Sequence, residues 1–134
     1  MKEKISSNGW LLIDKPEGIE SFGVIRKLKF RYSFHKIGFA GTLDPLASGL
    51  LLIGVNKATK KIPNVHNEKK SYIVEIRFGA TTNTLDSEGR FSKMKTVSHS
   101  ISDRTHYLKN FIGTYQQKIP NFSAHKSKGK NFYE

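Results

Sequence analysis

Two short apolar runs constrain the fold of this chain more than any other feature. The first, at residues 10–14 (WLLID), ends in the turn sequence KPEG, and the second, LLLIGV, covers residues 50–55. Apolar runs of about four to eight residues bounded by turn residues are typical of buried strands. We therefore predict strands at Trp10–Asp14 and Leu50–Val55.

A helix is predicted directly after the first strand. Val24, Ile25 and Leu28 recur at helical spacing, and the residues between them are largely basic. Apolar side chains at this spacing form one face of an amphipathic helix. Ser21 lies where its hydroxyl can accept hydrogen bonds from the free amide groups at the helix start, so we predict that Ser21 caps a basic amphipathic helix.

The stretch Tyr32–Ser48 shows no period and is rich in glycine, which predicts a long loop. Loops of this length are usually functional or disordered, and this one is too apolar for disorder. After the second strand, Asn56 is a candidate cap for a short helix at Ala58–Ile62, which Pro63 limits.

Alternation replaces helical spacing in the second half of the chain. Tyr72, Val74, Ile76 and Phe78 alternate with more polar residues, which predicts a strand with one apolar face and antiparallel pairing. Further along we predict a loop, a strand, a helix with three inward side chains and the opening of another helix: Gly79–Arg90, Phe91–Val97, Ser102–Ile112 (Leu108, Phe111 and Ile112 inward) and Gly129–Glu134.

Helices and strands mix here without strict β-α-β alternation. This order favours an α+β fold with a mixed, largely antiparallel sheet and flanking helices. No repeat or linker divides the 134 residues, so we expect one continuous unit.

Missing residue types exclude several classes of protein. The chain has no cysteine, which excludes disulfide scaffolds, thiolate zinc sites and cysteine nucleophiles. No apolar run approaches the roughly 18 residues of a membrane span, and residues 1–8 do not resemble a secretion signal, so we expect a cytoplasmic protein without a membrane partner. The five histidines lack the spacing of metal ligands, so we expect no metal.

The net charge points to a polyanionic partner. The chain carries 23 Lys and Arg residues against 11 Asp and Glu residues, a formal charge of +12. Both halves of the chain contribute to this excess, so it is not confined to a basic tail. Nucleic acid is the leading partner class, and solubility or an acidic protein partner is the alternative.

Residues 38–49 (GFAGTLDPLASG) hold a lone carboxylate, Asp44, between apolar neighbours. Pro45 restricts Asp44 to extended backbone angles and so presets the direction of its side chain. This is one way to build a reactive site. The alternative is that Asp44-Pro45 only starts a turn before the second strand, and local chemistry does not decide between the two interpretations.

The segment Gly41–Gly49 resembles the catalytic motif of the bacterial tRNA pseudouridine-55 synthases, the TruB family. Further blocks resemble family motifs in the same order and with similar spacing: Gly9–Pro16 (GWLLIDKP), Ala58-Thr59-Lys60, Lys70-Ser71-Tyr72, Thr82–Gly89 (TNTLDSEG), Ile119-Pro120 and Phe122–Lys126 (FSAHK).

The resemblance implies that uridine 55 in the T-arm loop of tRNA is isomerised to pseudouridine without a cofactor. It makes Asp44 the catalytic carboxylate, which either attacks C1′ or removes a sugar proton. It makes Tyr72 a ring that stacks on the flipped base, with a core tyrosine on the apolar face of its strand as the alternative. The other implied substrate-binding residues are Phe39, Gly41, Thr42, Leu43, Lys15 and Asp86. The basic side of the helix is a candidate contact for the RNA backbone, with a merely solvated helix face as the alternative.

Two departures from the family pattern lead to further expectations. Phe39 stands where the family usually has histidine, which keeps a stacking surface but loses a polar edge. The family's later segment, with an arginine that pairs with the catalytic aspartate, and its C-terminal PUA domain have no counterpart here. We therefore expect residues 1–134 to be the N-terminal portion of a catalytic domain, with its fold incomplete at the C-terminal end and its other half supplied elsewhere or by a second chain. The alternative is a truncated, non-catalytic RNA-binding remnant.

Overall fold

The computed structural model describes residues 2–97, 101–117, 126–127 and 130–131. The chain divides into two compact units, Met1–Tyr72 and Ile73–Glu134, where the sequence predicts one continuous unit. Helices and mostly antiparallel strands make up the two units, which confirms the predicted α+β class.

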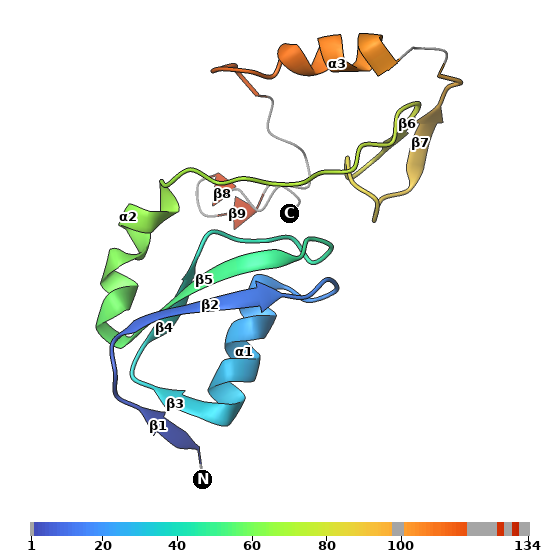
Figure 1. Ribbon diagram of the computed structural model, residues 1–134. Helices are drawn as coiled ribbons and strands as arrows, with labels where there is room; N and C mark the ends of the chain where they lie inside the picture. The colour runs from blue at the N-terminus through green and yellow to red at the C-terminus, as the bar shows by residue number, and fades with distance from the viewer. Residues whose placement is uncertain (1, 98–100, 118–125, 128–129, 132–134) are drawn as a thin grey trace. The chain divides into compact units, whose positions relative to one another are not determined.

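A three-stranded antiparallel sheet organises the first unit, in the order β2-β5-β4 (Figure 1). Strand β2 is Gly9–Lys15, β4 is Ile37–Ala40 and β5 is Gly49–Val55. Both strands predicted from the apolar runs are therefore confirmed. The second run forms the central strand, which explains why it is apolar almost throughout.

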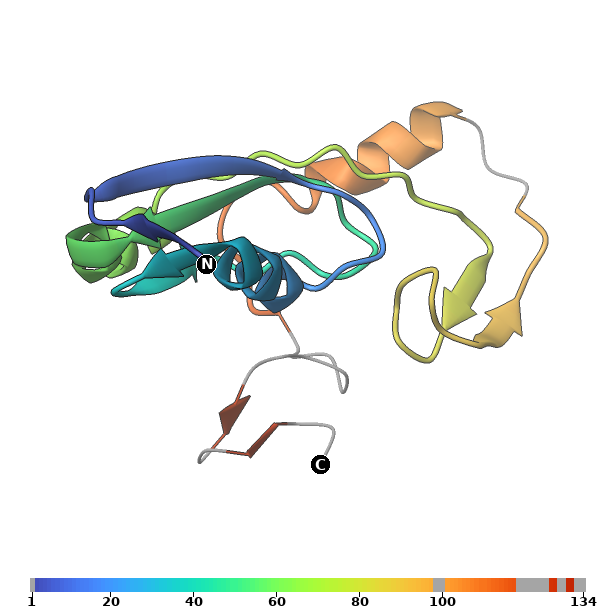
Figure 2. The same ribbon diagram turned by 90° about the horizontal axis from the view of Figure 1, so that it is seen from below.

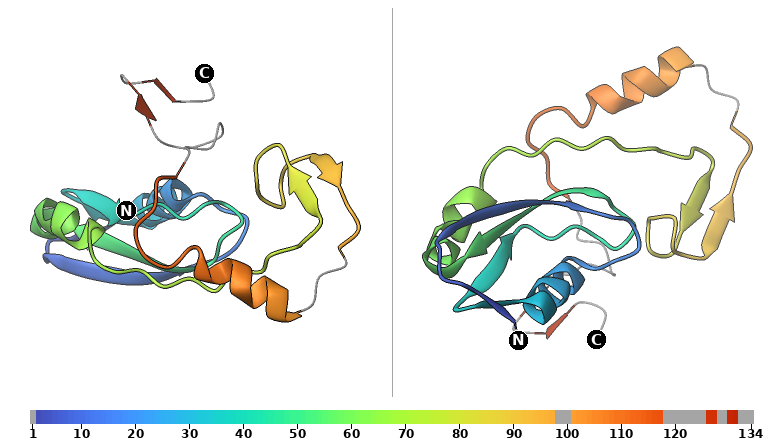
Figure 3. Two further views of the ribbon diagram at one scale, coloured as in Figure 1. Left: turned by 90° about the horizontal axis from the view of Figure 1, so that it is seen from above. Right: turned by 60° about the horizontal axis from the view of Figure 1, so that its bottom comes forward.

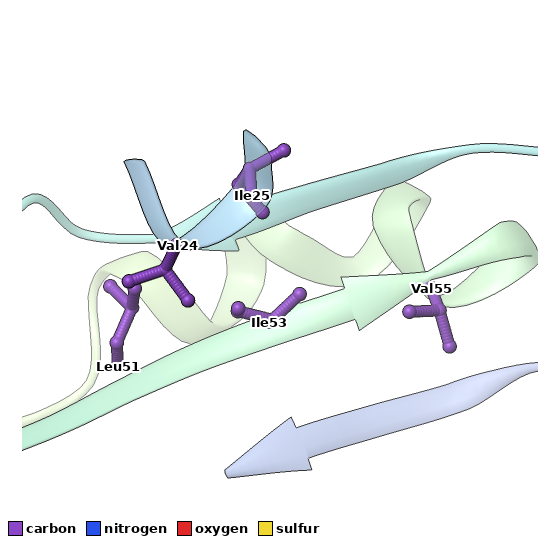
Figure 4. Packing of buried hydrophobic residues seen from close by; sticks show 5 residues of the cluster. All are labelled: Val24, Ile25, Leu51, Ile53 and Val55. Atoms are coloured by element: carbon purple, nitrogen blue, oxygen red, sulfur yellow. The ribbon is translucent and has the colours of Figure 1, made fainter. Parts of the chain in front are cut away.

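Helix α1 (Ser21–Arg31) covers one face of this sheet (Figures 1 and 3). Its buried Val24 and Ile25 pack with alternate residues of β5 (Figure 4). Removing an aliphatic side chain of this size from water stabilises the fold by about 1.5 to 3 kcal/mol. The predicted helix is thus confirmed, and the core residues contributed by β5 are Leu51, Ile53 and Val55.

The predicted cap of α1 is wrong. The residue at the cap position is Glu20, which makes no side-chain cap hydrogen bond, and Ser21 lies in the first turn of the helix. The Ser21 hydroxyl bonds instead to Leu43, 22 residues further along the chain. A buried hydroxyl near a helix start can serve a distant segment as well as its own helix, and the sequence does not distinguish the two.

The stretch predicted as one long loop contains two strands. Strand β3 (Tyr32–Phe34) pairs in parallel with β1 (Glu3–Ile5), and β4 follows it. Such short strands are too brief to show a period of two. Gly38 in β4 marks a close approach, because a Cβ built there would lie 3.2 Å from Cδ1 of Ile62. The loop is thereby reduced to the residues between β4 and β5.

Two short helices follow β5 at the far end of the sheet (Figure 2). The first is a 3-10 helix, η1 (Asn56–Lys61), and the second is α2 (Ile62–His66). The short helix predicted at Ala58–Ile62 is present as η1, which ends at Lys61, before Pro63. Pro63 does not end the helical stretch, since it lies in the first turn of α2, where a missing amide N–H costs nothing.

The sequence predicts Asn56 as a helix cap, but the structure shows a buried junction between four segments at this residue. Its Oδ1 accepts hydrogen bonds from the amides of His35 (3.0 Å) and Lys36 (3.2 Å). Its Nδ2 donates to the carbonyl oxygens of Ile5 (3.0 Å) and Ser7 (2.6 Å). The backbone of Asn56 has a left-handed φ of 54°, which asparagine tolerates better than most residues. This residue therefore joins β1, the β1–β2 connection and the β3–β4 connection to the end of β5.

The second unit holds a hairpin, a helix and a pair of two-residue strands. Its elements are β6 (Ala80–Thr82), β7 (Phe91–Met94), α3 (Ile101–Lys109), β8 (Lys126–Ser127) and β9 (Lys130–Asn131). The strand predicted at residues 91–97 is confirmed over its first part, and β6 occupies part of a predicted loop. A strand at 130–131 replaces the opening of a helix predicted there, and the rest of that prediction at 129 and 132–134 lies outside the described residues.

The predicted helix at residues 102–112 ends earlier, at Lys109, and its three apolar residues do not point inward. Leu108, Phe111 and Ile112 are 50%, 63% and 81% exposed. Spacing identifies an apolar face but does not show which surface covers it.

The strand predicted from alternation at residues 72–78 is also wrong. Residues 71–77 are in no strand, and the alternating apolar side chains are exposed: Tyr72, Val74, Ile76 and Phe78. Alternation indicates that one face is suited to burial, whereas a strand also needs a partner backbone. Among the described residues, no strand pairs with this segment.

We predict that Asn56→Gly destabilises the protein by at least about 2 kcal/mol, because it leaves two amides and two carbonyls without their partner. Asn56→Ala should cost about 1 kcal/mol more, since alanine does not tolerate the left-handed backbone. Urea denaturation measures both effects, with the exposed Lys60→Ala as control. An Asn56→Gly variant within about 0.5 kcal/mol of the parent would contradict the role of the junction.

Candidate active site

The loop that carries Asp44 connects β4 to β5. It rejoins the sheet beside the end of β2, where Lys15 pairs with Gly49. Gly41 and Gly49 bound the loop with φ values of +80° and +117°, which favour glycine. Inside the loop, the amide of Ala47 donates to the carbonyl oxygen of Asp44 at 3.1 Å, so a tight turn follows the aspartate directly.

The residue before Asp44 is held by one buried hydroxyl. Oγ of Ser21 accepts a hydrogen bond from the amide of Leu43 and donates one to the carbonyl oxygen of the same residue, both at 2.9 Å. Ser21 is 1% exposed, and the Leu43 side chain packs against the core. Both backbone polar groups of Leu43 are therefore satisfied by a residue of α1.

The residue after Asp44, Pro45, is held by the KPEG turn. The carbonyl oxygen of Pro45 accepts from the amide of Gly18 at 2.7 Å and from Nζ of Lys15 at 3.3 Å. Lys15 is 0% exposed, and its Nζ also donates to the carbonyl oxygens of Pro16 (3.0 Å) and Ile19 (2.7 Å). Three carbonyl oxygens thus accept hydrogen bonds from the three N–H groups of a fully buried ammonium.

Asp44 itself is exposed, as is Thr42. The backbone is fixed on both sides of the aspartate, and the following proline narrows its backbone angles further. The carboxylate is therefore presented to solvent from a rigid support. This arrangement suits a group that must meet a substrate in one orientation.

The predicted site residues fall into two groups. Lys15, Gly41, Thr42, Leu43 and Asp44 come together in the loop and the turn that supports it. Of these, Lys15 lies beneath the loop backbone and has no exposed surface with which to touch a substrate.

The remaining predicted residues lie outside this support. Phe39 is on β4, half-buried, and packs against the core cluster. Tyr72 is 65% exposed at the end of the first unit. Asp86 belongs to the second unit, where its Oδ1 accepts from the amide of Glu88 at 3.0 Å and from the hydroxyl of Thr84. Substrate contacts by these three residues stay predictions.

Sequence reasoning missed two residues that hold the loop, Ser21 and Gly18. The KPEG sequence indicates a turn, and Gly18 has the left-handed φ of +84° that a turn glycine provides. Its hydrogen bond to a loop 27 positions away leaves no local signal in the sequence.

Comparison with protein families identifies the chain. The sequence profile described as TruB family pseudouridylate synthase (N terminal domain) matches residues 27–134. The chain belongs to the TruB family. The matched region includes the whole Asp44 loop and extends across both compact units.

Individual TruB relatives match nearly all of the chain. It is 39% identical over 127 residues to tRNA pseudouridine synthase B of Ruegeria sp. strain TM1040, which covers 95% of this chain and 42% of the relative. The corresponding enzyme of Clostridium kluyveri is 42% identical over 127 residues, with 95% of this chain and 44% of the relative covered. That of Thermus thermophilus is 41% identical over 122 residues, covering 91% and 39%. The chain spans less than half the length of these relatives.

Other predictions concern membranes, metals and later motifs. In the part of the chain that the structure describes, no helix is long and apolar enough to cross a membrane. The same residues contain no group of three or more His, Asp or Glu side chains placed to hold a metal ion, and a metal-free, cofactor-free site stays a prediction. The motif at 119–120 and nearly all of that at 122–126 lie outside the described residues.

We predict that Lys15→Met loosens the Asp44 loop. The change leaves the carbonyl oxygens of Pro16, Ile19 and Pro45 without the ammonium, which should cost about 1 to 3 kcal/mol in the free energy of unfolding. Amide hydrogen exchange at Gly18 should also become faster, because its acceptor on Pro45 becomes more mobile.

The matched control for this change is Lys27→Met, at an exposed position of α1, which should alter stability by no more than about 0.5 kcal/mol. Unchanged exchange at Gly18 in Lys15→Met would show that the buried ammonium does not hold the loop.

Proposed function

We propose that the protein containing this chain isomerises uridine to pseudouridine in tRNA, at position 55 of the T-arm loop, with Asp44 as the catalytic carboxylate. The observation that carries the proposal is an exposed aspartate on a loop fixed at both neighbours, within the region that matches the TruB profile. The relatives' names supply the reaction and the substrate class.

The reaction needs no external reactant, because product and substrate are isomers. The bond between C1′ and N1 breaks, the uracil ring turns, a bond forms between C1′ and C5, and C5 loses its proton while N1 gains one. C1′ becomes electron-poor when the glycosidic bond breaks. A carboxylate can stabilise or attack such a carbon, as in glycoside hydrolysis.

Asp44 suits this role in its ionised form. It can attack C1′ directly, or it can remove a sugar proton and so start elimination of the base. Both steps require an accessible carboxylate, and the Asp44 side chain is exposed. Its held backbone limits the directions that the carboxylate can take, which supports the proposal.

Recognition of tRNA follows from charge and from stacking. The formal charge of +12 suits a phosphate backbone, and the exposed basic residues of α1 are candidate contacts. A base inside the T-arm loop must leave its stack to reach Asp44, at a cost of a few kcal/mol. The exposed ring of Tyr72 is our candidate for stacking on that base.

Residues 1–134 form, in this proposal, the N-terminal portion of a catalytic domain that works in the cytoplasm. Two findings support the assignment: the matched profile describes an N-terminal domain, and the chain covers 42% of the Ruegeria relative. The remaining part of the site then comes from residues outside this sequence, including an arginine to pair with Asp44.

We predict that Asp44→Asn lowers the rate of pseudouridine formation by a factor on the order of 10² to 10⁴, because the amide lacks the negative charge that the reaction uses. Affinity for tRNA should stay within about twofold, since binding rests mainly on phosphate contacts. The protein should be purified from its own cells, and digested tRNA analysed by nucleoside chromatography.

The control is Glu17→Gln, which neutralises another exposed carboxylate in the neighbouring turn and should leave the rate unchanged. Full activity of Asp44→Asn would refute the assigned role. A parent protein that binds RNA in a salt-dependent way but forms no pseudouridine would support the non-catalytic remnant instead.

A further inference from the structure

We propose that Ser21 is a positioning residue for catalysis, which sets the direction of the Asp44 carboxylate through the backbone of Leu43. This inference rests on the proposed function and adds to it a residue from α1 that the loop motif does not contain.

The geometry of a single hydroxyl carries the inference. Oγ of Ser21 lies 2.9 Å from both the amide nitrogen and the carbonyl oxygen of Leu43, accepting from the first and donating to the second. The hydroxyl therefore uses its one proton and one of its lone pairs on the same residue. Two contacts to one residue fix the orientation of the peptide groups on both sides of its Cα.

The second of these peptide groups joins Leu43 to Asp44. Its carbonyl oxygen accepts the hydrogen bond that Ser21 donates, and this bond holds the plane of the peptide group. The N–Cα bond of Asp44 therefore starts from a held plane. The next peptide group is held as well, because the carbonyl oxygen of Asp44 accepts from the amide of Ala47 at 3.1 Å. With both adjoining planes held, the direction of the Cα–Cβ bond of Asp44 is set, and the carboxylate extends from that bond.

Burial makes this contact dependable. Ser21 is 1% exposed, so water does not compete for its hydroxyl. It stands on the turn of α1 that precedes the buried Val24 and Ile25, and this part of the helix is fixed to the core. The position of Asp44 is thereby linked to the core of the sheet through one side chain.

The function of Ser21 differs from that of Lys15. Lys15 shares its ammonium among three carbonyls and holds the residue after Asp44, whereas the Ser21 hydroxyl serves Leu43 alone. We infer that loss of the hydroxyl shifts the carboxylate without greatly altering the surface that meets RNA.

The test measures two quantities for the parent protein and for each variant, made in the full-length chain. They are the single-turnover rate at saturating protein and the dissociation constant for tRNA. Ser21→Ala should lower the rate on the order of 10- to 100-fold, because a misplacement of about 1 Å at a reacting group costs this much. Its affinity for tRNA should stay within about twofold. Ser21→Thr, which keeps the hydroxyl, should recover most of the rate.

A matched control separates positioning from stability. Thr59 is also buried, and its Oγ1 donates to the carbonyl oxygen of Asn56 at 2.7 Å, away from the Asp44 loop. Thr59→Val removes a buried hydroxyl without altering a contact to the Asp44 loop. Under conditions in which this variant is folded, it should keep the parental rate. A loss of rate in Thr59→Val equal to that in Ser21→Ala would overturn the inference.

The Asp44→Asn variant separates failure of this inference from failure of the proposed function. If Asp44→Asn is inactive while folded Ser21→Ala keeps the parental rate within twofold, the inference on Ser21 fails alone. If the parent protein forms no pseudouridine, or Asp44→Asn keeps full activity, both fail. Faster amide exchange at Leu43 in Ser21→Ala, together with the loss of rate, would support positioning.

Discussion

Strand β5 is hydrogen-bonded on both sides, and the rest of the first unit depends on this central position. Its alternate side chains Leu51, Ile53 and Val55 supply three of the five residues in the buried core cluster, and α1 supplies the other two. Two polar anchors lie at its ends. Asn56 directly follows the last residue of β5 and bonds to three other segments. The Asp44 loop leads into the first residue of β5, which pairs with Lys15. One apolar strand therefore places both the Asn56 junction and the Asp44 loop.

Buried polar groups, rather than apolar contacts alone, fix the Asp44 loop. A buried ammonium or hydroxyl costs free energy unless its hydrogen bonds are made, and here Lys15 and Ser21 make theirs to backbone groups. Within the Asp44 loop, Lys15 donates to the carbonyl oxygen of Pro45, and Ser21 bonds to both backbone polar groups of Leu43. The backbone that carries the exposed carboxylate is therefore supported from within the protein, which is what the catalytic role proposed for Asp44 requires.

The sequence predicted the parts of the fold that depend on apolar pattern. The strands at 10–14 and 50–55 could be predicted because each is an apolar run bounded by turn residues, and the helix from Ser21 because its apolar residues recur at helical spacing. Strands β3 and β4 were missed because three or four residues show none. The alternation at 72–78 indicates an apolar face but not a partner strand, so a strand was predicted where the structure has none.

Polar contacts over long sequence distances were the least predictable part of the site. Ser21 and Asn56 were both assigned as helix caps, which is what their residue types favour locally. Their hydrogen bonds reach residues 22 and 51 positions away, and no local pattern records such a contact. By contrast, Asp44 stood out in the sequence because the motif around it resembles the family motif over nine consecutive residues.

The measurement that tests the proposed reaction most directly is release of tritium from tRNA labelled at C5 of its uridines. Joining C5 to C1′ expels the hydrogen at C5 into water, so one modified position releases the label of one uridine. The native protein should release one equivalent per tRNA, and none when cytidine replaces uridine 55. No release from the unaltered tRNA, or release that persists with cytidine at position 55, would contradict the isomerisation proposed for this site.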